Sequence, residues 1–433
     1  MKILVLSSTP WSNDNSFGNT FSNIFEGIDD IEVANISCRP GLPTSCVVKR
    51  YFQITEKSLI KNLIKKSFPT GIEIKVDDNK IDKSFSENIK AREFGSKKRW
   101  QILFWMRDLI WKLGRWKSQA LIDFIEDFKP DVIFQPVYFS SYLNDIVCFL
   151  KEHTKVPMIG YISDDCYTLK QFSLSPLYWI DRLYKRQKVK KTVEQCELLY
   201  VISNVQKQEY EKLFTPPCKV LTKCADFLDD KKPNFKEPGE VLKIVYAGNI
   251  SRGRYQILAE LAKSIQEINA DGQKIELDIY TLTPLTNKQK TVLSTESVHL
   301  YPPVSYNEIR EIQKNSDILL HVEGFSLKEK LAVHQSFSTK IVDYIESNRC
   351  ILAIGDDYCA SIQYFIKNGC GMVAKNKKEI KTRLLELHEN RNLLKQYADK
   401  AWESGKKYHY KPSIHNMVKK DLNNLLKTKK GEF

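Results

Sequence analysis

The stretch YAGNISRGR, residues 246–254, places small residues and two arginines between a predicted strand and a predicted helix. It contains Gly248, Asn249, Arg252 and Arg254. Backbone N–H groups at the start of a helix and a guanidinium fork can together bind a diphosphate. The spacing is not G-x-G-x-x-G, so the dinucleotide-binding fingerprint is absent, and a turn with solvated arginines is the alternative interpretation.

A second stretch, SFSTKIVDYI at residues 336–345, places a lysine at the start of another predicted helix. We expect Ser338 to cap this helix, with Thr339 and Lys340 in its first turn. A lysine there is unfavourable because the helix N-terminus carries partial positive charge, so Lys340 indicates an anionic ligand. Asp343 follows on the same face, where its carboxylate could accept hydrogen bonds from ribose hydroxyls. The alternative is a surface Lys–Asp ion pair, which contributes only tenths of a kcal/mol.

Short apolar runs alternate with amphipathic stretches along most of the chain, which predicts an α/β protein with buried parallel strands. In the first half we expect strands at residues 2–7, 132–134, 156–162 and 198–202, and helices at 120–128 and 205–214. In the second half we expect strands at 243–247, 275–280, 298–301, 318–322 and 350–354, and helices at 255–269, 306–314 and 339–346. Open sheets of this Rossmann-like kind bind ligands beyond the carboxyl ends of their strands.

The predicted organisation has two Rossmann-like domains joined by one linker. The N-terminal domain covers residues 1–228, the linker 229–240, a ligand-binding domain 241–395 and a basic helical tail 396–433. The linker carries two prolines and no apolar periodicity. We expect it to act as the hinge between the domains.

The composition favours anionic partners, because the 433 residues carry a formal net charge of +14. The N-terminus turns polar too early for a signal peptide, and no run reaches the ~18 apolar residues of a membrane span. The ten cysteines form no C-x-x-C pair and have no histidine spaced as a zinc partner. We therefore expect a cytoplasmic protein with reduced thiols and without structural zinc.

Residues 49–117 fit neither predicted half. They contain 18 Lys and Arg against 8 Asp and Glu, and four of the seven tryptophans, at positions 100, 105, 111 and 116. Such a basic aromatic segment suits contact with an anionic membrane surface. The alternative is an inserted helical pair whose aromatic face packs on the N-terminal domain. Nucleic acids also bind basic aromatic surfaces, but the segment has no recognition motif, so no nucleic-acid partner is expected.

The sequence resembles retaining nucleotide-sugar glycosyltransferases of the GT-B fold, in the family-4-like group of bacterial capsule and lipopolysaccharide sugar transferases. The resemblance covers nearly the whole chain and is strongest in YAGNISRGR, in HVEGF at 321–325 and in SFSTKIVDYIESNRCILAIG at 336–355. It implies that Arg254 and Lys340 bind the donor diphosphate and that Asp343 binds the ribose. It also implies that Gly18 and Asn19 lie in a loop that closes over the donor phosphates, with an ordinary turn glycine as the alternative.

The sequence departs from the E-x7-E motif of this family. Asp343 stands where the second glutamate is expected, and Gln335 stands eight positions before it. We expect Glu323 to be the displaced first carboxylate, facing the donor sugar, with a short helical insertion over residues 327–334 between the two halves of the motif. The neighbouring His321 is either a site residue or a core histidine.

A histidine that the family places near the sugar is missing as well. The corresponding stretch, residues 159–165, offers Asp164 and Asp165 at the end of a predicted strand. Either carboxylate could orient or deprotonate an acceptor hydroxyl, or the pair could cap the next loop. They do not form the D-x-D of metal-dependent transferases, so we expect neither a metal nor a cofactor.

The resemblance predicts an enzyme that moves a hexosyl group from a nucleotide-diphosphate sugar to a glycan or lipid-linked acceptor in cell-surface polysaccharide synthesis, with retention. It would act in the cytoplasm, peripherally attached to the inner face of the cytoplasmic membrane. One alternative is a sugar-nucleotide epimerase of similar architecture, which needs catalytic acids and a histidine in the cleft. The other is an inactive binding or scaffold protein that has kept the fold.

Overall fold

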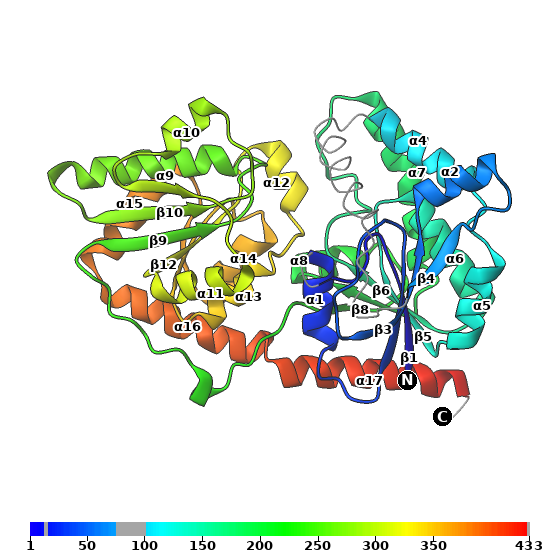
Figure 1. Cartoon of the computed structure of the whole chain (residues 1–433). Coiled ribbons are helices and arrows are strands. Elements are labelled where there is room, and N and C mark those ends of the chain that lie inside the picture. Colours follow the sequence, from blue (N-terminus) through cyan, green and yellow to red (C-terminus); the bar gives the residue numbers. More distant parts are fainter. Residues whose placement is uncertain (13–15, 75–100, 431–433) are drawn as a thin grey trace.

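The computed structural model describes residues 1–12, 16–74 and 101–430. Figure 1 shows two α/β domains side by side, each built on one mainly parallel sheet covered by helices. The predicted fold class, two Rossmann-like domains, is confirmed.

The N-terminal sheet has eight strands in the order β4-β3-β2-β1-β5-β6-β7-β8, and β3 and β4 are its antiparallel pair. Its strands are β1 (Lys2–Ser7), β2 (Glu32–Ser37), β3 (Val48–Ile54), β4 (Gly71–Ile74), β5 (Val132–Pro136), β6 (Met158–Ile162), β7 (Leu198–Val201) and β8 (Cys218–Val220). Its helices are α1 (Ser16–Phe25), α2 (Glu56–Ile64), α4 (Gln101–Leu113), α5 (Gln119–Phe128), α6 (Ser141–Thr154), α7 (Pro176–Val193) and α8 (Asn204–Tyr210). The central strands β5, β6 and β7 are buried along their whole length, which explains their uninterrupted apolar runs.

The C-terminal sheet has six parallel strands in the order β11-β10-β9-β12-β13-β14, the doubly wound arrangement. Its strands are β9 (Leu242–Ala247), β10 (Ile275–Tyr280), β11 (Val298–Tyr301), β12 (Ile318–Val322), β13 (Cys350–Ile354) and β14 (Met372–Ala374). Its helices are α9 (Arg254–Ile268), α10 (Asn287–Leu293), α11 (Tyr306–Asn315), α12 (Leu327–Val333), α13 (Lys340–Glu346), α14 (Ala360–Asn368), α15 (Lys377–Glu389) and α16 (Asn392–Tyr408). The chain order reverses between β9 and β12, because β9 leads to β10 on one side and β12 follows on the other.

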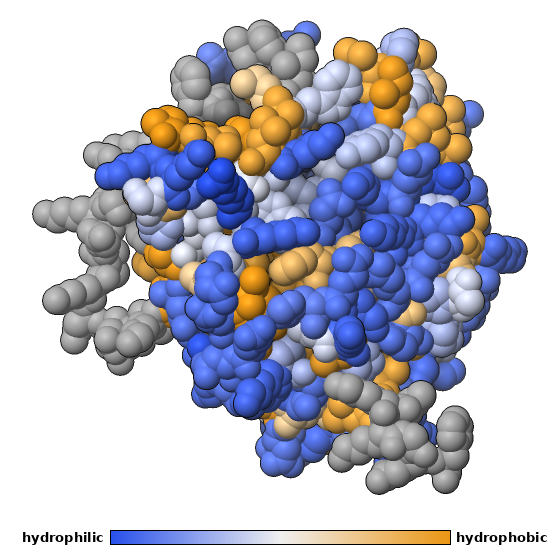
Figure 2. Space-filling model, turned by 90° about the vertical axis from the view of Figure 1, so that its right-hand side faces the viewer, coloured by the Kyte–Doolittle hydropathy of each residue, from blue (hydrophilic) through white to orange (hydrophobic). Residues whose placement is uncertain are grey.

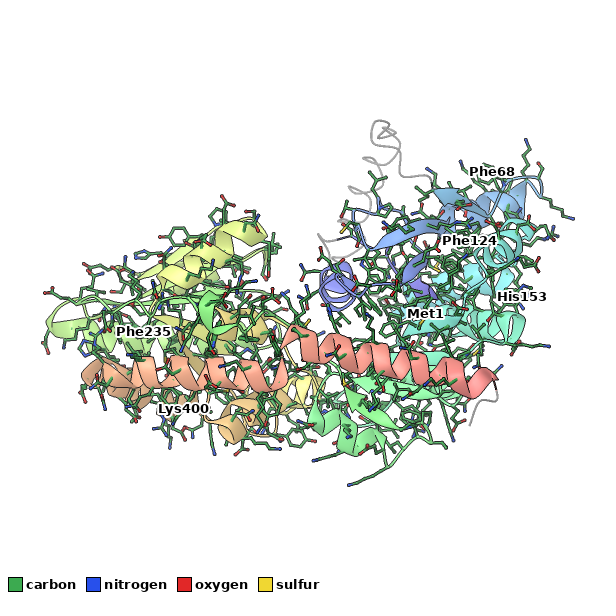
Figure 3. All side chains as sticks on the ribbon, turned by 90° about the horizontal axis from the view of Figure 1, so that it is seen from below. Met1, Phe68, Phe124, His153, Phe235 and Lys400 are labelled. Carbon is green, nitrogen blue, oxygen red and sulfur yellow. The ribbon has the colours of Figure 1, made fainter. Side chains whose placement is uncertain are left out.

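Two segments connect the domains. After β8 the chain passes through a short 3-10 turn, Asp229–Lys231, to reach β9. The last helix, α17 (Lys411–Lys430), returns to the N-terminal domain, where Asp421 accepts hydrogen bonds from Tyr200 Oη at 2.7 Å and Lys219 Nζ at 2.5 Å. Figure 3 shows α16 and α17 running in succession beneath both domains. The tail therefore holds the two domains together as well as covering them.

The described parts of the basic aromatic segment, residues 49–74 and 101–117, belong to the N-terminal domain, so the expectation that the segment fits neither half is wrong for these parts. They pack on that domain, as the alternative interpretation expected, but they include strands as well as helices. Its first part supplies β3, α2 and β4 at the edge of the sheet. Trp111 is buried and stacks on Tyr142 of α6 at 4.4 Å, and Trp116 is also buried, whereas Trp105 is 36% exposed. Residues 75–100, with Trp100, lie outside the described residues. The strands were missed because charged residues interrupt their apolar pattern: β4 is the edge strand of the sheet, and β3 lies next to it.

Candidate functional site

The carboxyl ends of strands from both sheets line one cleft between the domains. A cavity of about 480 Å³ lies in it, with walls from the ends of β5, β6, β9 and β12, from α1, and from the segment before α13. In the C-terminal sheet, β9 and β12 flank the point where the strand order reverses. Ligands of doubly wound sheets bind in this crevice, so the topology alone marks the cleft as the candidate site.

Arg254 and Glu323 form an ion pair in the C-terminal wall of the cavity. Arg254 is the first residue of α9, and its Nη2 donates to Glu323 Oε2 at 2.8 Å. Its Nε donates to the carbonyl of Val322 at 2.9 Å. Only 6% of the Glu323 side chain is exposed, and burial raises the pKa of its carboxyl group although the guanidinium opposes this. The positive charge of Arg254 is therefore partly balanced by the protein itself.

His321 lies beside this pair, with its Nε2 3.5 Å from Glu323 Oε1. Burial, followed by the charges of Arg254 and Lys340, lowers the pKa of His321 to about 3, so the ring is neutral at pH 7. Its Nε2 has no hydrogen-bond partner among the described residues, although the side chain is buried. A buried polar atom in this state indicates a ligand or water in the cavity, so His321 is a wall residue of the site rather than a satisfied core histidine.

Lys340 brings a second cation to the same cavity. It is the first residue of α13, and its Nζ donates to the carbonyl of Ala247, at the end of β9, at 2.8 Å. A methyl group at Gly248 would lie 2.7 Å from this Nζ, so the glycine makes room for the ammonium group. The side chain is exposed to the cleft, yet loss of hydration and the nearby Arg254 lower the pKa of Lys340. The unliganded site is therefore electropositive, and a bound anion would reduce the repulsion between Arg254 and Lys340.

The loop between β9 and α9 adopts an unusual backbone conformation. Arg252 and Gly253 both have positive φ, at 55° and 76°, and Gly253 is the N-cap of α9. The first turn of α9 has no acidic residue and no capping side chain, and Arg252 is exposed on the cavity wall. A left-handed arginine is strained, and such strain is common where the backbone must approach a ligand.

A second cavity of about 590 Å³ adjoins the first. It is lined mainly by the C-terminal domain, with residues that follow β10 and β11 and residues of α11 and α13. Five residues line both cavities: Thr20, Ala247, Asn249, Thr339 and Lys340. The two cavities therefore meet at Lys340, and Asn19 and Gly248 also lie on the side of the second one.

Asp343 lies in this second cavity but is already paired. Its Oδ1 accepts hydrogen bonds from Lys223 Nζ at 2.6 Å and Tyr306 Oη at 3.1 Å, and Arg310 Nη1 lies 4.0 Å away. Burial would lower the pKa of Lys223, but the Asp343 carboxylate outweighs it and the pKa is raised. Lys223 follows β8, so this buried pair joins the two domains. Sequence reasoning missed Lys223, because 120 residues separate the partners.

The structure separates the two neighbouring aspartates after β6. Asp164 lines the first cavity, and its Oδ1 accepts a hydrogen bond from Ser336 Oγ across the cleft at 2.8 Å. Asp165 does not line it; its carboxylate accepts hydrogen bonds from Arg182, Gln171, Tyr210 and the backbone of Tyr167 and Thr168, and 2% of the side chain is exposed. A carboxylate with so many donors holds its own loop in place. The prediction that Asp165 acts on an acceptor hydroxyl is therefore replaced by the alternative, a structural role in the loop.

Tyr161, near the end of β6, is another residue that the sequence did not single out. Its side chain is 4% exposed, lines the first cavity and has no hydrogen-bond partner for its hydroxyl among the described residues. Burial and the nearby Asp164 raise its pKa, so the hydroxyl is protonated at pH 7. The hydroxyl is therefore available to a ligand on the N-terminal side.

Gly18 has a local structural role. A methyl group there would lie 2.1 Å from the carbonyl oxygen of Ser12, so only glycine fits this approach of the chain. Gly18 lines neither cavity, whereas Phe17 and Thr20 line the first and Asn19 and Thr20 the second. The loop therefore reaches the site through the neighbours of Gly18.

The predicted cap of α13 is wrong. The helix begins at Lys340 and its N-cap is Thr339, in αR conformation and without a side-chain cap, whereas Ser338 contributes only its backbone carbonyl to Ile341 N. Ser338 and Thr339 still line the first cavity. Gln335 is buried and donates to Glu209 of α8 at 2.6 Å, so it serves the contact between domains and does not line the cavity.

Among the described residues, no group of three or more His, Cys, Asp or Glu side chains could hold a metal ion. None of the described helices combines the length and the hydrophobicity that crossing a bilayer requires.

No protein-family model and no curated protein matches the chain in sequence. Solved structures do match it. HepE of Anabaena, in complex with UDP and glucose, gives a TM-score of 0.62 at 10% identity over 98% of this chain and 100% of that one. WaaG, a glycosyltransferase involved in lipopolysaccharide biosynthesis, gives 0.56 at 12% identity over 96% and 98%. The chain has the GT-B fold.

A third match shows how far this likeness extends. S. aureus TarM, solved with UDP, gives a TM-score of 0.53 at 14% identity over 71% of this chain. The chain spans 58% of TarM, so the additional part of that protein has no counterpart here. At these identities the likeness establishes the GT-B fold, and the residues of the cleft must carry the argument for function.

Proposed function

We propose that this GT-B protein is a glycosyltransferase that uses a nucleotide-diphosphate sugar as donor. The observation that carries the proposal is the junction of two cavities, of about 480 and 590 Å³, at Lys340. A nucleotide sugar has two bulky ends joined by a diphosphate, which matches two pockets that meet at a cation. The UDP in the HepE and TarM structures supports a uridine nucleotide as the first donor to test.

The donor would lie with its nucleoside in the second cavity and its sugar in the first. Asp343 lines the nucleoside end, where its carboxylate could accept from ribose hydroxyls while Lys223 holds it in place. Lys340, the loop with Asn249 and the start of α9 surround the junction, which suits the diphosphate. Glu323 and His321 line the sugar end.

Cleavage of the sugar–phosphate bond places growing negative charge on the leaving diphosphate. Lys340, Arg254 and the first-turn N–H groups of α9 would stabilise that charge, so the reaction needs no metal ion on these grounds. We expect retention of configuration, with the departing phosphate accepting the proton of the acceptor hydroxyl. Asp164 and Tyr161 on the opposite wall would orient that hydroxyl.

The acceptor would be a glycan or a lipid-linked saccharide, and the N-terminal domain carries a surface that suits a membrane. Exposed apolar side chains follow the outer faces of two neighbouring helices: Leu103, Met106, Leu109 and Leu113 on α4, and Leu177, Ile180 and Leu183 on α7. The helices are linked by Trp105 Nε1, which donates to Asp181 Oδ1 at 3.0 Å. Figure 2 shows apolar surface along the upper edge, where α4 and α7 lie in Figure 1.

The membrane surface can be tested by co-sedimentation with vesicles of phosphatidylcholine alone or with one third phosphatidylglycerol. We expect recovery to rise with anionic lipid and to fall with salt, because lysines on these helices attract the headgroups. Replacing Leu109 and Ile180 with Glu should remove binding, whereas the same change at Leu282 of the C-terminal domain, 80% exposed, should not. Equal recovery of the protein with both kinds of vesicle would contradict an electrostatic contribution to membrane binding.

The donor proposal is tested by a thermal-shift screen of nucleotides and sugar nucleotides, since a ligand of the folded state raises the midpoint by mass action. We expect one nucleoside diphosphate and its sugar derivatives to stand out. Incubating the best sugar nucleotide without an acceptor and following it by NMR separates the alternatives. Conversion of the donor sugar would indicate an epimerase, and absence of binding and turnover with every donor would indicate an inactive scaffold.

A further inference from the structure

A third cavity, of about 540 Å³, lies where the chain crosses back between the domains at residues 407–417, and we call it the hinge cavity. The N-terminal domain contributes β8 and α8 to its wall, and the C-terminal domain contributes α14. The remaining wall is the segment 407–417, where α16 passes into α17 and the chain crosses back between the domains. Figure 3 shows this crossing from below. A molecule in the hinge cavity would therefore contact both domains and the tail.

The lining of the hinge cavity is amphipathic. About half of its lining residues are apolar or aromatic, among them Val205, Val220, Tyr364, Ile414 and Met417. Methionine and aromatic rings adapt to planar and aliphatic groups alike. A volume of about 540 Å³ falls in the range of small-molecule sites, about 300–1,000 Å³. The cavity has the size and the walls for a small organic molecule.

The charged side chains of this lining are all of one sign. Lys367, in the last turn of α14, and Lys407, in the last turn of α16, line the cavity, and no Asp or Glu is among its lining residues. Neither ammonium group makes an ion pair with a residue in the described part of the chain, although thirty other pairs are formed there, and Lys407 lies over the ring of Tyr408 at 5.0 Å. Charge complementarity therefore favours an anionic head group.

His409 forms a polar floor that needs no ligand. Its Nδ1 is 2.9 Å from Thr222 Oγ1 in the N-terminal domain, and its Nε2 is 3.0 Å from Tyr364 Oη in the C-terminal domain. Burial lowers its pKa to about 4, so the ring is neutral at pH 7. Both ring nitrogens are occupied, which leaves the two lysines as the groups that a charged ligand can satisfy.

The hinge cavity adjoins the donor cleft. Ile202 and Phe337 line both, and Phe337 lies three residues before Lys340. The ring of Phe337 also packs parallel to His409, with centroids 5.8 Å apart and an angle of 16°. The hinge cavity is thus a neighbour of the cleft and distinct from it.

We propose that the hinge cavity binds a small amphipathic anion, with an aromatic or aliphatic body against Tyr364 and Met417 and one carboxylate or phosphate head between Lys367 and Lys407. This proposal concerns binding and stands independently of the sugar transfer.

A pair of fluorescent probes tests it: 8-anilinonaphthalene-1-sulfonate, an amphipathic anion, and N-phenyl-1-naphthylamine, its uncharged counterpart. Both are titrated into the full chain. In the variant Lys367→Gln/Lys407→Gln, the affinity for the anionic probe should fall about three- to tenfold, since each exposed charge pair contributes a few tenths to 1 kcal/mol. The affinity for the neutral probe should stay within twofold. The control variant Lys288→Gln/Lys290→Gln, on α10, removes the same charge far from the cavity and should change neither.

A second variant tests the location. Ser413 is exposed and lines the cavity, so a larger side chain there can extend into it. Ser413→Trp together with Ala360→Leu should fill the cavity and remove one binding equivalent of both probes, while circular dichroism shows an unchanged fold. Equal affinities for the anionic probe in the wild type, the lysine variant and the filled variant would overturn the proposal and assign the signal to the exposed face of α4 and α7.

Discussion

Replacing Lys340 with Met removes the ammonium group at the junction of the two cavities and keeps the length of the side chain. In the wild type, the Lys340 Nζ donates to the Ala247 carbonyl at 2.8 Å, and the side chain is exposed to the cleft. A charge-assisted hydrogen bond to a diphosphate contributes about 1.5–3 kcal/mol. Losing one such bond should weaken the binding of UDP about 10- to 150-fold, because ~1.4 kcal/mol corresponds to a factor of ten.

The folded state should tolerate this change. In the unliganded protein, loss of hydration and the charge of Arg254 lower the pKa of Lys340, which means that the ammonium form is disfavoured where it stands. Lys340→Met should therefore leave the thermal midpoint unchanged or raise it slightly. Isothermal titration with UDP and a thermal unfolding curve, measured on the same preparation, report the two effects separately.

Gly248→Ala provides the matched variant. The added methyl group would lie 2.7 Å from the Lys340 Nζ and displace it without removing the charge, so UDP binding should weaken by less than in Lys340→Met. Lys330→Met, on α12, removes a lysine that pairs with Asp356 at 2.8 Å outside both cavities and should leave UDP affinity unchanged. If Lys340→Met bound UDP within twofold of the wild type, the placement of the diphosphate at this junction would be wrong.

Three further predictions follow from the same geometry. A bound diphosphate should raise the lowered pKa of Lys340. UDP affinity should therefore be constant below the pKa that Lys340 has in the unliganded protein, and fall as the pH rises through that pKa. The accompanying proton uptake is measured by calorimetric titration in buffers of different ionisation enthalpy. Arg254→Met leaves the buried Glu323 carboxylate without its donor at 2.8 Å and should reduce the free energy of unfolding by about 3–5 kcal/mol, less at acid pH where Glu323 is protonated; an equal loss at neutral and at acid pH would refute the role of the unpaired carboxylate. Asp164→Asn should slow transfer at least tenfold with an unchanged thermal midpoint, whereas Asp165→Asn should lower the midpoint, and the reverse pattern in a paired kinetic and unfolding experiment would exchange their roles.

The central strands were predictable from the sequence because burial on both faces leaves an uninterrupted apolar run. The buried strands β1, β12 and β13 occupy the residues that this pattern indicates, and the half-buried β10 and the edge strand β11 were also predicted at their observed bounds. A strand whose apolar run is interrupted by charged residues escapes the rule. In β3, Lys49 and Arg50 interrupt the run, and Arg50 pairs with Glu73 on β4 at 2.8 Å instead of facing a core. In the sequence, a charged strand near the edge of a sheet cannot be distinguished from a surface segment, because the strand that pairs with it is not known.

The sequence indicated which charged residues lie near the cleft, but it did not indicate which groups they contact. Their positions near strand ends and helix starts indicated Arg254, Lys340 and Asp343 as site residues, and the structure places all three on the walls of the two joined cavities. The difference between Asp164 and Asp165 could not be read from the sequence, because it depends on Arg182, seventeen residues later, which holds one carboxylate away from the cleft. Local pattern thus locates a site, and tertiary contacts decide which of its residues face a ligand.

Two polar contacts between the domains lie on segments that carry the candidate donor site. Lys223 and Asp343 form one of them and are buried, with 7% and 10% of their side chains exposed, and Ser336 donates to Asp164 four residues before Lys340. Separating the domains along this line would leave Asp343 without the lysine that neutralises it inside the second cavity. A nucleotide that donates ribose hydroxyls to Asp343 satisfies its remaining lone pairs while Lys223 stays bound. If the ribose of the donor binds Asp343 as proposed, binding of the donor and closure of the two domains depend on the same carboxylate, and removing Lys223 should weaken both.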